Sequence, residues 1–240
     1  MCPKKFDFNY VQKIRSETTW QMQRGIDVHQ FCNEFYDNLM FTNGTYAVNP
    51  DFVEAFFKQC SPDAIEQINN FMLFEHSRWE ICKSLCPKNP KKLFIPLLRE
   101  GKFVSDKLEQ VTILDRLDAR TDGNYTLVEI KTERFQPKGW KQTEFRREMM
   151  FEKLTAEASP EFQKNFPNDI LDFVVYFPRS NDIFAESFNW RTASALKKSL
   201  EKMREDIKNK NYSCNVEYHC RFCYYNSLCD FTFDRNVKQK

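Results

Sequence analysis

Residues 111–131 read VTILDRLDARTDGNYTLVEIK, and they carry the strongest indication of the fold class. Two runs rich in aliphatic and β-branched residues flank Thr121-Asp-Gly-Asn124, a typical turn sequence. The pattern therefore predicts strands over 111–120 and 125–132, joined as a β-hairpin. Because side chains alternate between the two faces of a strand, we expect Glu129 and Lys131 on one face, and Val128 and Ile130 in the core.

The same hairpin carries a candidate catalytic site. It can bring Asp115 beside Glu129, and two carboxylates with Lys131 nearby are typical of a site for a hard divalent cation. Such a site suits phosphodiester hydrolysis, because the metal lowers the pKa of bound water and stabilises charge on the scissile phosphate. Lys131 can orient the water or balance charge. The alternative interpretation is a half-exposed hairpin with solvated charges.

The remaining elements predict a mixed fold. Residues 6–40 are mostly helical, and 51–86 form two amphipathic helices divided at Ser61-Pro62-Asp63, with Ser61 as the N-cap. A proline-rich linker covers 87–92. Further elements are expected as follows: a strand at 93–98, a helix at 140–158, a strand at 171–177 and a helix at 190–210. With no internal repeat, this order predicts an α/β (α+β) fold.

Composition limits the functional classes. The 240 residues are 41% hydrophobic and 29% charged, with a net charge of +2, as in an ordinary globular protein. No apolar run approaches the roughly 18 residues of a membrane span, and no signal-peptide pattern precedes the first helix, so we expect a cytoplasmic protein with no membrane partner. A charge of +2 means that any DNA binding comes from a local groove. Rossmann and P-loop motifs are missing.

The cysteines predict a second metal centre. The tail reads His219-Cys-Arg-Phe-Cys-Tyr-Tyr-Asn-Ser-Leu-Cys229, a C-x2-C-x5-C pattern that leaves a four-ligand site one thiolate short. Cys2, near the other end of the chain, can supply the fourth. Soft thiolate sets of this kind select zinc or an iron–sulfur cluster. We expect the other five cysteines to be buried or inert thiols: Cys32, Cys60, Cys82, Cys86 and Cys214.

Further candidate residues lie near the proposed site. His29, in the sequence Arg24-Gly-Ile-Asp-Val-His29, can complete the coordination of the cation, although a lone histidine is more often a surface or capped residue. Arg116, Arg146 and Arg147 are candidates for phosphate contact, and Trp140 and Phe145 for stacking on unpaired bases. The alternative is an amphipathic helix with a charged face and an aromatic core stripe.

The order of these motifs resembles a known family. Arg24-Gly-x-x-x-His29, Asp115-Arg-Leu-Asp118, Glu129-Ile-Lys131 and the cysteine pattern together resemble the iron–sulfur form of the RecB-like PD-(D/E)xK nucleases. Chain length and motif order are most similar to the Cas-four type CRISPR-associated nucleases. The resemblance spans Cys2 to Cys229.

The resemblance implies a domain organisation and a set of cofactor ligands. A restriction-endonuclease-like core over 93–211 would follow an N-terminal helical lobe over 1–92 and precede an iron–sulfur segment over 212–240. Magnesium or manganese would be held by His29, Asp115, Glu129 and the carbonyl of Ile130, with Lys131 as the catalytic lysine. A 4Fe–4S cluster would be held by Cys2, Cys220, Cys223 and Cys229, and Cys32 is the next candidate if Cys2 is not a ligand.

The resemblance also implies an activity. The protein would be a metal-dependent DNA nuclease, acting as an exonuclease or endonuclease on single-stranded or flayed DNA. It would trim DNA ends for CRISPR spacer acquisition, together with the CRISPR integrase complex. Arg147 and Phe151 stand where the family presents a glutamine and a tyrosine. Two alternatives remain open: a stand-alone repair or replication nuclease, and a non-catalytic DNA-binding protein with a structural zinc.

Overall fold

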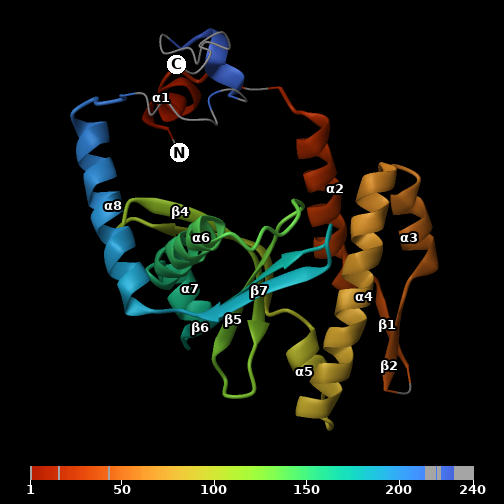
Figure 1. Ribbon diagram of the computed structural model, residues 1–240. Coiled ribbons are helices and arrows are strands. Elements are labelled where there is room, and N and C mark those ends of the chain that lie inside the picture. The colour runs from red at the N-terminus through yellow and green to blue at the C-terminus, as the bar shows by residue number, and fades with distance from the viewer. Residues whose placement is uncertain (1, 16, 43, 214–219, 221–222, 230–240) are drawn as a thin grey trace. The chain divides into compact units, whose positions relative to one another are not determined.

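The chain divides into two compact units in a computed structural model (Figure 1). The structure describes residues 2–15, 17–42, 44–213, 220 and 223–229. One unit is Trp20–Leu196, and the other combines Met1–Thr19 with Lys197–Lys240. This grouping differs from the three consecutive segments expected from the sequence, because the helices before residue 92 share a hydrophobic core with the sheet.

A five-stranded sheet forms the centre of the larger unit, in the order β3-β4-β5-β6-β7. The strands are β3 (Leu98–Ser105), β4 (Gln110–Ala119), β5 (Tyr125–Ile130), β6 (Ile170–Phe177) and β7 (Asp182–Ser187). The predicted hairpin is confirmed as β4–β5, with Arg116 opposite Val128. Only β5 and β6 pair in parallel, so a crossover must join them. Helices α6 (Gly139–Glu157) and α7 (Pro160–Asn165) make that connection.

Helices cover both faces of this sheet. On one face, α2 (Trp20–Glu34) and α4 (Pro62–Leu85) bury residues such as Phe31 and Phe71 against Ile130 of β5. On the other, α6 and α7 bury residues such as Met149 against Leu127 of β5. Figure 1 shows α6 and α7 lying together across that face. Because β5 is covered on both sides, even its charged residue Glu129 is buried.

Several predicted boundaries differ from the structure. The strand expected over 93–98 is wrong: Lys91–Phe94 form the short helix α5, and β3 begins only at Leu98. A short apolar run fits a buried helical turn as well as a buried strand, so periodicity could not separate the two. Three further features were not predicted from the sequence: β7, α7, and the small hairpin of β1 (Leu39–Thr42) and β2 (Thr45–Val48).

The division of residues 51–86 into two helices is confirmed. Helix α3 covers Pro50–Phe57, and the Ser61 hydroxyl accepts a hydrogen bond from the Ala64 N–H at 3.3 Å at the start of α4. Among the described residues, no helix combines the length and the apolar character that crossing a bilayer would require.

The smaller unit joins the two ends of the chain. Helix α1 (Pro3–Phe6) continues into a π-helical turn over Asp7–Val11, and a 3-10 turn covers Tyr224–Ser227. The rings of Phe8 and Tyr225 stack with centroids 5.3 Å apart, and the Tyr225 hydroxyl donates a hydrogen bond to the Ile14 carbonyl at 2.7 Å.

The helix predicted over 190–210 is confirmed as α8 (Trp190–Lys208). The division between the two units falls within it, after Leu196.

Candidate metal centre and active site

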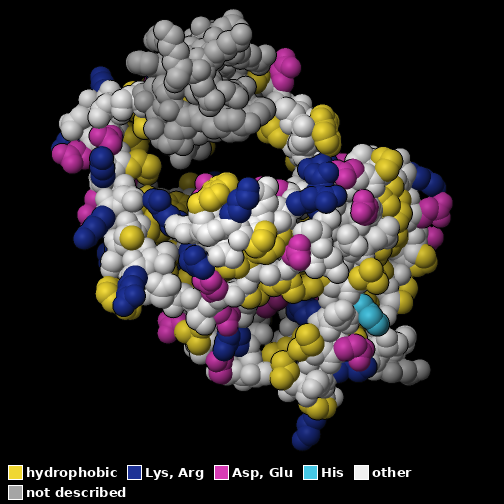
Figure 2. Space-filling model, viewed as in Figure 1, with side chains coloured by type: hydrophobic (Ala, Val, Ile, Leu, Met, Phe, Trp, Pro, Cys, Tyr) yellow, Lys and Arg dark blue, Asp and Glu magenta, His cyan; other side chains and the backbone are white. Residues whose placement is uncertain are grey.

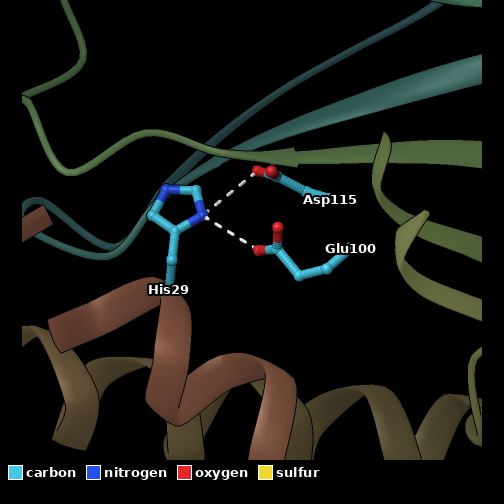
Figure 3. Close-up of side chains that lie close together, drawn as sticks. All are labelled: His29, Glu100 and Asp115. Carbon is cyan, nitrogen blue, oxygen red and sulfur yellow. Dashed lines mark ion pairs between the residues drawn. The ribbon is translucent and has the colours of Figure 1, made fainter. Parts of the chain in front are cut away.

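Three elements of the larger unit bring a histidine and two carboxylates together. His29 comes from α2, Glu100 from β3 and Asp115 from β4. The Nδ1 atom of His29 lies 3.6 Å from Oδ2 of Asp115 and 3.7 Å from Oε1 of Glu100. Figure 3 shows the imidazole pointing from its helix towards both carboxylates. One ligand atom from each residue lies within 4.8 Å of the other two, so the group can hold a metal ion.

An interruption in the β-sheet positions these carboxylates. The β3–β4 ladder pairs Arg99 with Arg116 and Gly101 with Leu114, but omits Glu100 and Asp115 between them. Glu100 has a φ of 50°, in the left-handed region that costs free energy for a residue with a Cβ. The Asp115 Oδ2 atom accepts the Ile130 N–H at 2.9 Å, which fixes the carboxylate at the end of β5.

A second acidic group lies on the α6 side of the sheet. It consists of Glu129 on β5 with Glu148 and Glu152 on α6, and one oxygen from each lies within 4.8 Å of the others. The Lys131 ammonium lies 2.5 Å from Oε1 of Glu129 and 3.0 Å from Oε1 of Glu148. The Oε2 atom of Glu152 is shielded from solvent, and in the described part of the chain it has no hydrogen-bond partner.

Burial and mutual repulsion raise the carboxylate pKa values of this region. Burial, followed by the nearby Asp115 charge, raises the pKa of Glu129 to about 8, although Lys131 acts in the opposite direction. Burial also raises the pKa of Asp115, against the effects of His29 and the Ile130 N–H. The pKa of Glu152 is raised well above its usual value by burial and by Glu129. The cationic side chains nearby are therefore too few to stabilise the ionised form of all of these carboxylates.

The nearby carboxylates also shift the pKa values of the two basic groups of the site, His29 and Lys131. Burial acts to lower the pKa of His29, but the nearby Glu100 carboxylate and the charges of Asp115 and Glu129 outweigh it, so the pKa is raised. Burial likewise opposes the charged form of Lys131, while Glu129 and Glu148 raise its pKa above the ordinary value. Lys131 is therefore an ammonium at neutral pH.

The position of Arg116 contradicts its predicted contact with DNA. Its side chain is buried, and its guanidinium donates to the Tyr36 hydroxyl and to Glu75 at 2.7 Å each, and to Asp118 at 2.9 Å. Alternation along β4 turns Arg116 and Asp118 towards α4, where Glu75 and Arg78 lie. Arg116 therefore belongs to a buried network that joins α4 to the sheet.

The other predicted DNA contacts lie on or beside α6. Trp140 is 59% exposed and Arg147 is exposed, so both are accessible to a ligand. Arg146 is half-buried and donates to Glu186 at 2.6 and 2.5 Å. The stacking role expected for Phe145 is wrong, because its ring is buried in the core. On the face viewed in Figure 2, Lys and Arg side chains lie among Asp and Glu side chains.

The predicted cluster cysteines all belong to the smaller unit. Cys220 is buried, whereas Cys2, Cys223 and Cys229 are half-buried. Cys32 instead lies in the core of the larger unit beside Val28 and Phe31, where burial raises its pKa well above the usual thiol value. This position is that of an inert core thiol, as the sequence first suggested. Cys214 lies outside the described residues.

Sequence reasoning missed three acidic residues of the region. Glu148 and Glu152 are four apart, which places them on one side of a helix, and this spacing could have flagged them. Glu152 also falls within the buried stripe of α6, where a charge is unexpected. Glu100 had no comparable signal, because its position depends on where β3 begins and where its ladder is interrupted.

The chain was compared with models of protein families and with curated proteins. The family model described as the PD-(D/E)XK nuclease superfamily matches residues 1–230 of the chain. Comparison with curated proteins found no match.

Proposed function

Because the chain belongs to the PD-(D/E)XK nuclease superfamily, we propose that it is a divalent-metal-dependent deoxyribonuclease acting on single-stranded or flayed DNA. Superfamily membership by itself indicates a metal-dependent nuclease. The observation that carries the proposal is the convergence of His29, Glu100 and Asp115 from three elements, beside Glu129 and Lys131. Catalysis would then rest on Lys131, Asp115 and Glu129.

The residues present fit a hard divalent cation. Carboxylate oxygens with one imidazole are ligands that magnesium or manganese accepts. The raised pKa values of Asp115 and Glu129 arise from burial first and from neighbouring negative charge second, and a bound cation would offset both. We assign His29, Asp115, Glu129 and the Ile130 carbonyl as ligands, and add Glu100. A bound cation supplies Lewis-acid stabilisation of the charge that develops on the scissile phosphate.

Lys131 would stabilise the reacting groups directly, and the carboxylates around it would hold it in position. Lys131 holds its proton at Nζ, so it would donate hydrogen bonds to a phosphate oxygen or the attacking water and balance developing charge. Its contacts with Glu129 and Glu148 orient the ammonium at the end of β5. Asp115, held by the Ile130 N–H, would keep its position while substrate binds.

The substrate proposal depends on the surface of α6. Trp140, at the start of the helix, offers an exposed aromatic face, and stacking on such a face is available to any unpaired base. Arg147 is exposed two turns later and can reach a phosphate. Arg146 would add to this surface after leaving Glu186. Exposed aromatic and basic groups together favour single-stranded or flayed DNA over an intact duplex.

We further propose that Cys2, Cys220, Cys223 and Cys229 hold a 4Fe–4S cluster. Contacts of Tyr225 with the N-terminal segment support this, because they bring the stretch that follows Cys2 to the cysteine-rich tail. Thiolate ligation would join the two ends of the chain and stabilise the folded state. The order of motifs, most similar to the Cas-four type nucleases, supports the finer proposal of DNA-end trimming with the CRISPR integrase complex.

Cleavage of end-labelled single-stranded DNA in manganese tests the nuclease proposal. Lys131→Ala should lower the rate by about 10²–10³-fold, because one preorganised donor is removed, and EDTA should abolish cleavage. Lys102→Ala, which removes an exposed lysine of β3, is the matched control and should leave the rate unchanged. Cleavage that survives both EDTA and Lys131→Ala would contradict the proposal.

Metal analysis of anaerobically purified protein tests the cluster. We expect a brown protein containing iron and sulfide, and Cys223→Ala should remove the colour while Cys60→Ala retains it. A colourless protein that contains zinc would refute the iron–sulfur assignment.

A further inference from the structure

We propose that Glu129, Glu148 and Glu152 form a second divalent-cation site beside the His29–Glu100–Asp115 group, so that the centre takes two ions. The inference rests on the proposed function, since the second ion would serve the same phosphodiester chemistry. It adds two residues of α6 as metal ligands.

Glu152 provides the first argument. It lies on the buried face of α6, between the fully buried Met149 and Ala156, and is only 7% exposed. Its Oε2 atom is shielded from solvent and has no hydrogen-bond partner among the residues that the structure describes. Buried carboxylates are costly unless they are paired, hydrogen-bonded or bound to a metal. A cation in front of Glu152 would meet this requirement.

The arrangement of the three carboxylates provides the second argument. Glu148 is one helical turn before Glu152, and Glu129 faces them from β5. One oxygen from each lies within 4.8 Å of the others, so a single ion can be shared among them. An all-oxygen donor set suits magnesium or manganese better than a softer metal.

Charge balance provides the third argument. The ammonium of Lys131 contacts Glu129 and Glu148, but one positive charge leaves three carboxylates with a net formal charge of −2. Glu100 and Asp115 also carry −2 when His29 is neutral. Each group therefore has the charge that one divalent cation neutralises.

The arrangement also suggests what the second ion would do. In two-metal phosphodiesterases the ions lie about 3.5–4 Å apart and stabilise both the attacking and the leaving oxygen. A cation drawing Glu129 and Glu148 towards itself would weaken their contacts with Lys131. The ammonium would then be available to the substrate phosphate.

Manganese binding without DNA tests the inference, by calorimetric titration and by electron paramagnetic resonance. Wild-type protein should bind two Mn²⁺ ions per chain and show the spectrum of a spin-coupled pair. Glu152→Gln should bind one ion, with no spin coupling. Glu148→Gln should do the same, and because Glu148 is exposed, this variant keeps the test informative if Glu152→Gln does not fold.

Glu144→Gln is the matched control, because Glu144 lies one turn before Glu148 but is exposed and pairs with Lys141 at 3.3 Å. It should bind two ions. A wild type that binds one Mn²⁺ and still cleaves DNA would overturn the second site while leaving the nuclease proposal intact. Two coupled ions in a protein that does not cleave DNA would support the second site and overturn the nuclease proposal instead.

Discussion

The central sheet buries charge on both sides, and the two sides differ in how that charge is compensated. Towards α4, Glu75 and Asp118 meet Arg78 and Arg116, with contacts of 2.7 to 3.4 Å and no net charge. Towards α6, the three carboxylates of the acidic group share one Lys131. The first network is complete within the protein, whereas the second is short of positive charge and so is suited to an external cation.

The pKa values of two buried glutamates, Glu75 and Glu129, show this difference between the two sides of the sheet. Burial acts to raise the pKa of both Glu75 and Glu129. Around Glu75, the charges and hydrogen bonds of Arg78 and Arg116 outweigh burial, and its pKa is lowered. Around Glu129, the Asp115 charge adds to burial, and its pKa rises to about 8. Both carboxylates are buried, so the charges of the neighbouring side chains decide whether the pKa is lowered or raised. A buried carboxylate with cationic partners stabilises the fold, whereas one without enough of them is suited to bind a cation.

The largest effect is expected from breaking the balanced network. Glu75→Ala leaves Arg78 without its main counter-charge and the buried Arg116 with Asp118 alone, and should lower the free energy of unfolding by about 3–5 kcal/mol. Urea denaturation measures this loss. Glu80→Ala on the same helix, which removes an exposed pair with Lys83, should cost less than about 1 kcal/mol. Equal losses in the two variants would show that the network is not a stabilising feature.

The next effect is the pH dependence of stability in metal-free protein. Glu129 has a folded-state pKa of about 8, above its unfolded value, so the folded state binds more protons between these two values. Stability is therefore highest near pH 5 and falls as the pH rises to 8, by on the order of 3 kcal/mol. The raised pKa values of Asp115, Glu152 and His29 act in the same direction.

Thermal melts in EDTA from pH 5 to 8 measure this dependence. Glu129→Gln should flatten the profile, and manganese at pH 8 should restore the stability of the wild type. A melting temperature that rises over this range would contradict the raised carboxylate pKa values.

A smaller and opposite effect is expected at Glu152. Glu152→Met replaces a buried carboxylate, whose Oε2 atom lacks a hydrogen-bond partner among the described residues, with an apolar side chain of similar size. It should raise the metal-free free energy of unfolding by about 1–3 kcal/mol at pH 8. Urea denaturation with and without manganese separates the two roles, because the variant should lose part of the stabilisation that manganese provides. Destabilisation in EDTA would mean that Glu152 makes a favourable contact in the metal-free fold.

The smallest effect is expected from the backbone at Glu100. Glu100→Gly removes a Cβ from a residue with a φ of 50°, and should stabilise metal-free protein by about 0.5–1 kcal/mol. Glu109→Gly is the matched control, since Glu109 has the same φ in the β3–β4 turn. Both variants should be more stable by thermal melting, but only Glu100→Gly should weaken manganese binding. Equal manganese affinities would exclude Glu100 from the centre.

Much of the framework of the larger unit was predictable from local sequence patterns. Alternation and the Thr121–Asn124 turn predicted the β4–β5 hairpin, and helical spacing with the Ser61 cap predicted α4. The short motifs also identified Asp115 and His29, which the fold places 3.6 Å apart. These features were readable because local periodicity, turn residues and caps act within a few residues of the chain.

Which charged residues face a site and which face the core depends on packing between segments distant in sequence. Arg116 has the sequence context of a phosphate contact, yet packing against α4 buries it with Glu75. Glu100 has the context of a surface residue, yet an interrupted ladder brings it to the metal centre. Glu152 lies in the apolar stripe of α6, and it meets Glu129 only because this helix packs across the sheet. Strand alternation fixes the side of a sheet on which a residue lies, but the pKa and partners of a buried charge depend on segments distant in sequence.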